Sequence, residues 1–381
     1  KTSGKVMKIA VNTRFLLSNK LEGIGWHTYE ILRRLVRAHP QDSFYFFFDR
    51  PYDPQFVFAP NVHPLVLFPP ARHPVLFYWW FEWSVSRALR QINPDVFYSP
   101  DGFLSLRSQT PTLLTIHDLA YRHFPEHLPP LMRTYYNRMM PQYVMKAGQI
   151  AAVSEYTKED IIQQFNVSPE RISVVYNGVR SVFSPDSTTG SRSIRHQVTG
   201  GNPYFLYVGS MHPRKNINRL LEAFRLFKAS GQWNHHLILV GRMAWKSTGI
   251  RQEVEQHPDR ATIHLPGNIT DEQMVDYYRE AQALIYPSLF EGFGMPVLEA
   301  LACHTLPVIS QSSSLPEVGG EVAIYVDPLD PGSIVQGMQR ATQHDPHHPA
   351  WTHRVDQHLK KFNWNRSADQ IYRDLCKLSG Y

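Results

Sequence analysis

Short apolar segments alternate with helical stretches along almost the whole chain, and this alternation limits the possible folds more than any other feature of the sequence. In the first half, the apolar segments cover residues 8–12, 43–48, 62–68, 96–99, 113–116 and 149–153. In the second half, strands are expected at 204–209, 236–240, 262–265, 283–286 and 306–310, with helices at 218–230, 271–280 and 296–302. Short strands without polar alternation are typical of parallel sheets that helices cover on both faces. The sequence therefore predicts an α/β fold.

One polar segment divides the two series. Residues 184–203 are mainly turn formers with almost nothing to bury, so we expect a linker there. It would separate a first domain at 7–183 from a second domain at 204–361, each doubly wound and Rossmann-like. A chain of 381 residues is long enough for two such domains with cores of their own.

Charge and cysteine content exclude several classes of protein. The chain carries 39 Lys and Arg against 33 Asp and Glu, and residues 1–183 hold 20 of the basic and 14 of the acidic side chains, so the whole excess lies in the first half. These basic residues are scattered and no recognition motif accompanies them, so we expect no nucleic-acid partner. Cys303 and Cys376 are too few for a disulfide framework or a zinc site, and they indicate a reducing, cytoplasmic setting.

The densest functional signal is the segment YPSLFEGFGMPVLEA, from Tyr286 to Ala300. It predicts a strand end, a glycine turn and a helix start, because Pro296 suits the first turn of a helix. Glycines let the backbone approach a ligand closely, and the first amides of a helix can donate to hydroxyls or an anion. Glu291 and Glu299 flank this turn and can bind polyols. Alternatively, Glu291 caps the turn and Glu299 is a solvated helix residue.

The string Glu-Gly-Phe-Gly-Met-Pro, followed by a second Glu, resembles the signature of the family-4 retaining glycosyltransferases. These enzymes have the GT-B fold, in which two Rossmann-like domains face a cleft, and the resemblance runs along nearly the whole chain. It implies that Glu291 lies beside the donor sugar and that Glu299 binds the ribose hydroxyls of the nucleotide. The turn amides that would bind the sugar belong to Gly292, Phe293, Gly294 and Met295. The closing segment, about 362–381, resembles the family's final helix, which crosses back to the first domain.

A second motif, GSMHPRKN, follows the first strand of the second domain. Ligands of open α/β sheets bind at the carboxyl ends of strands, so Arg214 and Lys215 stand where a phosphate would bind. The family has a similar glycine-to-Arg-Lys-Asn segment whose cations hold the donor diphosphate, which also implies donor contacts for Gly209 and Ser210. Ser210 departs from many relatives, which have arginine there. Without the resemblance, two adjacent cations on a loop are usually just solvated.

In the first half, His117 and Asp118 follow an apolar strand. His117 resembles the family's histidine at the floor of the cleft, which contacts the donor sugar, whereas Asp118 can simply cap a turn. The loop containing Gly23 and Gly25 resembles the one that approaches the donor phosphates and the acceptor.

A further donor-site prediction concerns the loop before the helix at 271–280. The family lines its nucleobase pocket with backbone here, which implies contacts from Gly267, Asn268 and Ile269. The alternative is a purely structural loop in which Thr270 or Asp271 caps the helix.

The resemblance implies a reaction that transfers a sugar from a UDP- or GDP-linked donor to a hydroxyl of a glycan or lipid-linked glycan, with retention of configuration. The catalytic residues would be His117, Glu291, Arg214 and Lys215. No cofactor is expected beyond the donor, and no metal, because the chain has no Asp-x-Asp motif. The overall texture is similar to bacterial polysaccharide and lipopolysaccharide mannosyltransferases. Two alternatives stay open: a nucleotide-sugar epimerase of the same fold, and a non-catalytic sugar-nucleotide binding protein.

The basic excess of the first half suggests a partner of its own. It favours contact with an anionic membrane surface or a lipid-phosphate acceptor, at the inner face of the plasma membrane. The aromatic stretch FYWWFEW at 77–83 is too short to cross a bilayer. It is either a membrane-facing helix or part of the core of the first domain.

Overall fold

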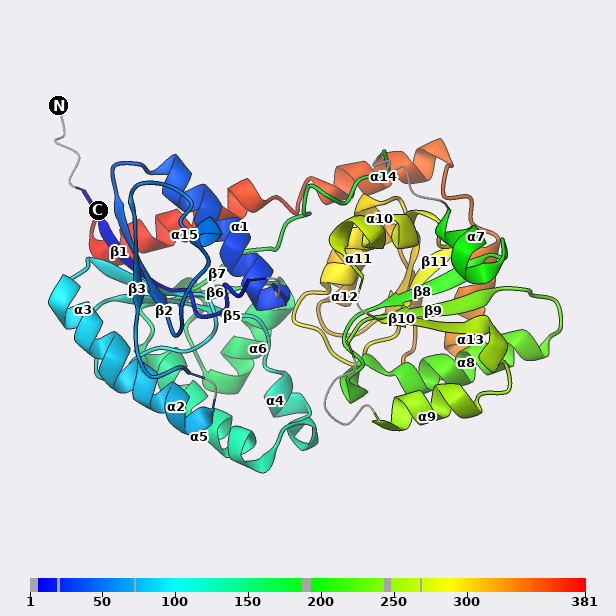
Figure 1. Ribbon diagram of the computed structural model, residues 1–381, viewed down its shortest axis with the longest axis horizontal. Coiled ribbons are helices and arrows are strands. Elements are labelled where there is room, and N and C mark those ends of the chain that lie inside the picture. Colours follow the sequence, from blue (N-terminus) through cyan, green and yellow to red (C-terminus); the bar gives the residue numbers. More distant parts are fainter. Residues whose placement is uncertain (1–5, 19–20, 72, 187–192, 243–247, 268) are drawn as a thin grey trace. The chain divides into compact units, whose positions relative to one another are not determined.

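The computed structural model of the chain describes residues 6–18, 21–71, 73–186, 193–242, 248–267 and 269–381 (Figure 1). The chain forms two compact units: unit 1 comprises Lys1–Asn177 and Asn363–Tyr381, and unit 2 comprises Gly178–Phe362. The division at Asn177 and Gly178 precedes the linker expected at 184–203. Part of that segment, 187–192, lies outside the described residues, and a further part forms the short helix α7 (Ile194–Thr199).

Unit 1 contains a sheet of seven parallel strands in the order β3-β2-β1-β4-β5-β6-β7. The strands are β1 (Lys8–Asn12), β2 (Ser43–Phe48), β3 (Val62–Val66), β4 (Val96–Ser99), β5 (Thr112–Ile116), β6 (Gln149–Ala152) and β7 (Ile172–Val174). The α-helices are α1 (Gly23–Ala38), α2 (Pro74–Trp79), α3 (Ser86–Ile92), α4 (Ala120–His123), α5 (Pro130–Lys146), α6 (Glu155–Phe165) and α15 (Trp364–Ser379). A π-helical segment η2 (Trp80–Val85) joins α2 to α3, and short 3₁₀ turns are η1 (Pro54–Phe56), η3 (Pro125–His127) and η4 (Pro169–Arg171).

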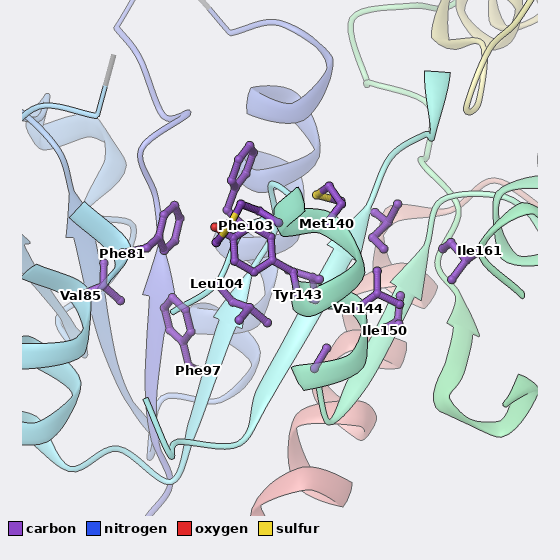
Figure 2. Close-up of a cluster of buried hydrophobic side chains, with 14 of the residues drawn as sticks. Phe81, Val85, Phe97, Phe103, Leu104, Met140, Tyr143, Val144, Ile150 and Ile161 are labelled. Carbon is purple, nitrogen blue, oxygen red and sulfur yellow. The ribbon is translucent and has the colours of Figure 1, made fainter. Parts of the chain in front are cut away.

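Apolar side chains cover both faces of this sheet, as the two-sided strand pattern predicts. Ile9 and Val11 of β1 pack with α1 and α15, whereas Ala10 between them faces the opposite cluster. Figure 2 shows that opposite cluster, in which Phe81 of η2 and Tyr143 of α5 point toward the sheet. Helices α1 and α15 thus cover one face, and α2, η2, α3 and α5 cover the other (Figure 1).

The aromatic stretch at 77–83 is divided between core and surface. Trp80 and Phe81 are fully buried, and Trp80 Nε1 donates a hydrogen bond to the Leu67 carbonyl at 2.9 Å. Trp79 and Trp83 are exposed. The prediction that this stretch packs in the core is therefore confirmed for Trp80 and Phe81 but not for Trp79 and Trp83.

Unit 2 contains a second parallel sheet, with six strands in the order β10-β9-β8-β11-β12-β13. The strands are β8 (Tyr204–Val208), β9 (His236–Val240), β10 (Ile263–Gly267), β11 (Ala283–Tyr286), β12 (Pro307–Ser310) and β13 (Ile324–Val326). Besides α7, the helices are α8 (Ile217–Ala229), α9 (Thr248–Gln256), α10 (Asp271–Arg279), α11 (Met295–Ala302), α12 (Leu315–Gly319), α13 (Pro331–Thr342) and α14 (Pro349–Leu359). Short 3₁₀ turns are η5 (Pro213–Lys215), η6 (Arg260–Thr262) and η7 (Gly320–Val322).

Both units are doubly wound parallel sheets, which confirms the predicted fold class. In each sheet the direction of strand addition reverses once, between β1 and β4 in unit 1 and between β8 and β11 in unit 2. Loops after the strands that flank such a reversal diverge and leave room for a ligand. These two positions are therefore where binding residues are to be sought.

Among the described residues, no helix is long and apolar enough to cross a membrane.

Candidate active site

The candidate site of unit 2 lies at its strand-order reversal. The loop after β8 carries Arg214 and Lys215 in turn η5, and the loop after β11 carries Glu291. β8 and β11 are adjacent parallel strands, so both loops leave the same edge of the sheet side by side. The backbone joins them as well, because the Leu289 amide donates to the Arg214 carbonyl at 2.8 Å. Two motifs that lie far apart in the sequence therefore form one site.

Glu291 is the centre of this site. Lys215 Nζ lies 2.5 Å from Glu291 Oε1 and also donates to the Tyr286 hydroxyl at 2.7 Å. Arg214 donates to Glu291 Oε2 at 3.3 Å and to the Phe290 carbonyl at 2.8 Å. The side chains of Lys215 and Glu291 are almost fully buried, so the solvated-loop alternative is wrong for Lys215. We call Arg214, Lys215 and Glu291 the charge cluster.

The charge cluster keeps Glu291 ionised. Burial by itself raises the pKa of this carboxyl, but the positive charges of Lys215 and Arg214 outweigh it and bring the pKa to about 2. The cluster thus holds two cations against one carboxylate and keeps one net positive charge. A group with that net charge can accept a further anion such as a phosphate.

Hydrogen bonds from Ser314 stabilise the turn after Glu291. Ser314 Oγ donates to the carbonyls of Glu291 and Phe293, each at 2.9 Å. Gly294 takes a left-handed φ of +108°, and a Cβ atom there would lie 2.7 Å from Leu315 Cδ2. Helix α11 starts at the next residue, Met295; Pro296 has no N–H, and the Val297 amide donates to the Gly294 carbonyl at 3.0 Å. The sequence prediction of a glycine turn followed by a helix start is confirmed, with the helix beginning one residue early.

Glu299 is a buried residue of α11 with partners of its own, so the solvated-helix alternative is wrong. Its carboxylate accepts hydrogen bonds from Arg180 at 2.8 Å and from the Tyr278 hydroxyl at 3.1 Å. Burial raises the pKa of Glu299, although the charge of Arg180 opposes this shift. Arg180 also contacts Asp271 at 2.6 Å. Arg180 was not predicted from the sequence, because it belongs to none of the recognised motifs. The only sequence signal for a role at the site was its position directly after the Tyr-Asn-Gly-Val segment at 176–179.

Two glycines follow neighbouring strands of the sheet, and their backbones approach each other closely. Gly209 after β8 has a φ of +147°, and Gly241 after β9 has a φ of +143°. A Cβ atom on Gly241 would lie 2.0 Å from the Gly209 carbonyl oxygen, which only glycine avoids. Gly241 was not among the predicted site residues. Ser210 follows Gly209 and is partly exposed, and its carbonyl accepts a hydrogen bond from the Tyr207 hydroxyl at 3.2 Å.

The structure describes only part of the loop at 267–269, which was predicted to contact the nucleobase. Gly267 ends β10 with a φ of +80° and is exposed, Ile269 is half-buried, and Asn268 lies outside the described residues. Thr270 forms a capping box with Gln273 at the start of α10, so the helix-cap alternative is confirmed for this residue. Strand β10 pairs with β9, which pairs with β8, and all three strands are parallel, so this loop leaves the same sheet edge as the charge cluster.

In unit 1, His117 follows β5. Burial lowers the pKa of His117, and its Nε2 lies 2.7 Å from the Pro100 carbonyl. Since a carbonyl only accepts, Nε2 carries the proton and Nδ1 is left as an acceptor in the neutral ring. The neutral His117 can therefore accept a hydrogen bond from a hydroxyl group. Asp118 accepts from the Ala120 amide at 3.0 Å, which is the capping role considered from the sequence.

His27 supports His117 and was not predicted. Its ring lies edge-on to the His117 ring, with centroids 5.0 Å apart. Its Nδ1 donates to Asn177 Oδ1 at 2.8 Å, and its Nε2 accepts from the Tyr98 hydroxyl at 3.4 Å. Burial and the neighbouring His117 lower the pKa of His27 to about 3. The His27 ring is therefore neutral, held by two hydrogen bonds, and packed against the His117 ring.

Gly23 and Gly25 lie in the first turn of α1, so the expected loop is part of a helix. A Cβ on Gly25 would lie 2.9 Å from the Phe15 carbonyl oxygen, whereas a Cβ on Gly23 would meet nothing within 4 Å. Gly25 is thus required by the close approach of the chain after β1. Gly23 is exposed at the helix start, where amides without an intrahelical partner can meet a ligand.

The strand-order reversal of unit 1 contains a buried ion pair that sequence reasoning also missed. Arg14, after β1, pairs with Asp101, after β4, and both side chains are almost fully buried. The rings of Phe77, Phe81 and Phe103 surround the Arg14 guanidinium at 4.5–5.5 Å. Asp101 follows Pro100, whose carbonyl holds His117, so this pair fixes the loop that orients the histidine.

Two protein-family models match the chain. The model described as "Glycosyltransferase Family 4" matches residues 21–181, and the model described as "Glycosyl transferases group 1" matches residues 192–356. Together with the two doubly wound sheets and the charge cluster, these matches define the class. The chain belongs to the family-4 glycosyltransferases and has the GT-B type of fold.

Relatives agree with this class, and solved structures agree with its fold. The chain is 29% identical to "O-antigen chain mannosyltransferase B" of Escherichia coli over 362 residues, which cover 92% of this chain and 94% of that protein. It is 26% identical to "O-antigen chain mannosyltransferase RfbU" of Salmonella typhimurium, over 71% of each chain. Among solved structures, WaaG, a glycosyltransferase involved in lipopolysaccharide biosynthesis, gives a TM-score of 0.75 at 14% identity over 98% of this chain and 100% of WaaG. HepE of Anabaena, solved in complex with UDP-glucose, gives 0.73 at 17% identity over 97% of this chain and 100% of HepE.

Proposed function

We propose that this glycosyltransferase moves mannose from a UDP- or GDP-linked donor to a hydroxyl of a glycan or lipid-linked glycan, with retention of configuration. The observation that carries the proposal is the charge cluster at the strand-order reversal of unit 2. Mannose and a bacterial surface polysaccharide as the product are supported by the printed names of the two relatives. A nucleotide diphosphate sugar as donor is supported by the ligand of HepE.

The cluster suits a diphosphate leaving group. When the bond between the sugar and the diphosphate breaks, negative charge develops on the departing phosphate oxygen. Arg214 and Lys215 are held in place before the reaction, one by the Phe290 carbonyl and the other by Tyr286, so they stabilise that charge without reorganising. In this proposal they do the work that a divalent metal does elsewhere, and the activity survives EDTA. Loss of activity with EDTA and recovery with Mg²⁺ or Mn²⁺ would overturn that part.

The remaining polar groups would orient the donor. Glu291 and the turn amides from Gly292 to Met295 would bind the sugar hydroxyls, and Glu299 would bind the ribose. Both carboxylates are already hydrogen-bonded, so a hydroxyl would donate to a lone pair that the present partners leave open. His117 would accept from a sugar hydroxyl through Nδ1, and Gly23 at the start of α1 would approach the acceptor.

The proposed acceptor also explains the basic excess of the first half. A lipid-linked glycan is presented at a membrane, and an anionic inner membrane surface would attract unit 1. We therefore place the protein at the inner face of the plasma membrane as a peripheral enzyme.

A thermal-shift screen with UDP, GDP and ADP tests the donor site. A ligand that binds only the folded protein raises its melting temperature, so one nucleotide should raise it more than the other two. Lys215→Met should abolish this shift. Lys228→Met is the matched control, because Lys228 lies at the end of α8 and binds only backbone carbonyls there, and this variant should keep the full shift. No shift with any nucleotide would contradict the proposal.

A further inference from the structure

Exposed apolar side chains gather in one stretch of unit 1. Among the described residues, seven large hydrophobic side chains that face solvent fall between positions 65 and 83: Leu65, Val66, Phe68, Val75, Tyr78, Trp79 and Trp83. The most exposed of them is Phe68, at 80%. Exposed apolar groups that occur singly need no explanation, but such a concentration marks a contact surface.

The helical part of this stretch is amphipathic. Helices α2 and α3 with η2 between them run without a break from Pro74 to Ile92. Phe81 and Val85 point into the core, as Figure 2 shows. Val75, Trp79 and Trp83 recur every four residues on the outer side and are 53%, 48% and 37% exposed. Arg87 and Arg90 continue the outer side and are exposed as well. We call these five residues the helix stripe.

Ring contacts keep the helix stripe ordered. Trp79 and Trp83 stack with their centroids 4.2 Å apart, and the guanidinium of Arg107 lies 4.3 Å from the centre of the Trp83 ring. Glu82, buried beneath them, accepts hydrogen bonds from the Leu106 and Arg107 amides at 2.8 and 3.1 Å. The two indole rings thus lie at the surface on a helix that is anchored by the hydrogen bonds of Glu82.

The charge around the helix stripe has one sign. Between Asp53 and Asp95 the sequence contains a single acidic residue, Glu82, and its carboxylate is buried. Helix α5, which packs against α2, lies in a segment from 127 to 154 without any acidic residue and contains Arg133, Arg138 and Lys146. An exposed apolar surface whose own helix and packing helix α5 carry exposed cations and no exposed carboxylate is complementary to an anionic surface. A second copy of this chain would bring the same cations against each other.

We propose that the helix stripe, together with Tyr78 and Phe68, docks unit 1 on an anionic lipid bilayer. Phe68 lies beside the stripe, because Ser84 Oγ donates a hydrogen bond to the Phe68 carbonyl. Indole rings settle at the level of the lipid headgroups, and arginine binds lipid phosphates while its stem stays in the apolar layer. The purpose of docking rests on the proposed function, because a unit 1 docked on the bilayer would meet a lipid-linked acceptor there.

Vesicle co-sedimentation tests the proposal with the full chain. The protein should bind vesicles that contain phosphatidylglycerol, should bind pure phosphatidylcholine vesicles much more weakly, and should be released as salt rises from about 50 mM to about 500 mM. The double variant Trp79→Ser/Trp83→Ser should lower the partition by about tenfold or more. Arg87→Gln/Arg90→Gln should lower it by about fivefold for each charge and make binding less sensitive to salt.

Two controls keep the result interpretable. Leu226→Ser/Leu329→Ser removes two exposed leucines from unit 2 and should bind vesicles like the wild type. Every variant should keep its nucleotide-induced thermal shift and its transfer to a detergent-soluble acceptor, which separates a failure of docking from a failure of the proposed function. Absence of vesicle binding at low salt would overturn the proposal. So would equal binding by the tryptophan variant, or a wild-type dimer that Trp79→Ser/Trp83→Ser converts to a monomer.

Discussion

At the scale of single residues, Lys215 and Glu291 depend on each other. Each is buried and neutralises the other at 2.5 Å, so a change to one leaves a charge buried without its main partner. Stability and chemistry are coupled at this position, because the same side chains that would hold the donor also hold the loop after β11 in place.

This coupling makes a prediction about stability. Lys215→Met should lower the free energy of unfolding by up to about 3–5 kcal/mol, since the buried Glu291 then keeps only Arg214, at 3.3 Å, as a cationic partner. Lys215→Met/Glu291→Gln should recover much of that loss, because both charges are then gone. Urea unfolding of the wild type, the two single variants and the double variant measures the coupling. Additive effects of the two substitutions would show that the residues act independently and would contradict the geometry.

His117 makes a prediction about pH. Its Nδ1 can accept a hydrogen bond only while the ring is neutral, and burial keeps its pKa below the ordinary 6.5. His117→Gln can still donate to the Pro100 carbonyl but has no acceptor atom at the position of Nδ1, so kcat/KM should fall by about tenfold or more. The ratio of wild-type to variant kcat/KM should stay constant from high pH down through 6.5 and shrink only at lower pH, where the wild-type ring becomes protonated. A ratio that already shrinks well above pH 6.5 would contradict a neutral, buried ring.

At the scale of elements, the first turn of α1 distinguishes two glycines that look alike in the sequence. Gly25→Ala places a methyl group against the Phe15 carbonyl, so it should lower the free energy of unfolding by about 1–3 kcal/mol. Gly23→Ala meets open space and should leave stability unchanged or raise it slightly, by up to about 1 kcal/mol. Thermal unfolding of the two variants decides between them. Equal losses would show that the helix start is not packed as described.

The strands were largely predictable because most of them are apolar runs that are buried on both faces. The exceptions have physical causes: β7 and β13 are three residues long, too short to give a pattern. A loop was expected at Gly23 and Gly25 because glycines are typical of loops, but in the structure both residues belong to the first turn of α1, where tertiary contacts outweigh that preference.

The site was predictable where a motif places residues at a strand end, as for Arg214, Lys215 and Glu291. It was not predictable where a partner comes from a distant segment. Arg180 reaches Glu299 across 119 positions of sequence, and His27 reaches Asn177 across 150. Neither residue type nor local spacing encodes such a contact, because it arises only when the sheets bring the segments together.

At the scale of the whole molecule, the charge follows the division into units. Unit 1 carries 22 Lys and Arg against 16 Asp and Glu, whereas unit 2 carries 17 of each, so unit 1 holds the entire net charge of +6. The charge cluster belongs to the neutral unit and the helix stripe to the basic one. The proposed diphosphate site and the proposed docking surface thus belong to different units, so we expect that each can be impaired without the other.

The central claim is sugar transfer by the charge cluster, and a transfer assay tests it most directly. The mannose donor built on the nucleotide with the largest thermal shift is incubated with a lipid-linked glycan in EDTA, with wild type, Glu291→Gln and Lys228→Met. We predict a product that keeps the anomeric configuration of the donor, a rate about 100-fold or more lower for Glu291→Gln, and an unchanged rate for Lys228→Met. Unchanged transfer by Glu291→Gln, an inverted product, or donor that isomerises without any acceptor would contradict the account.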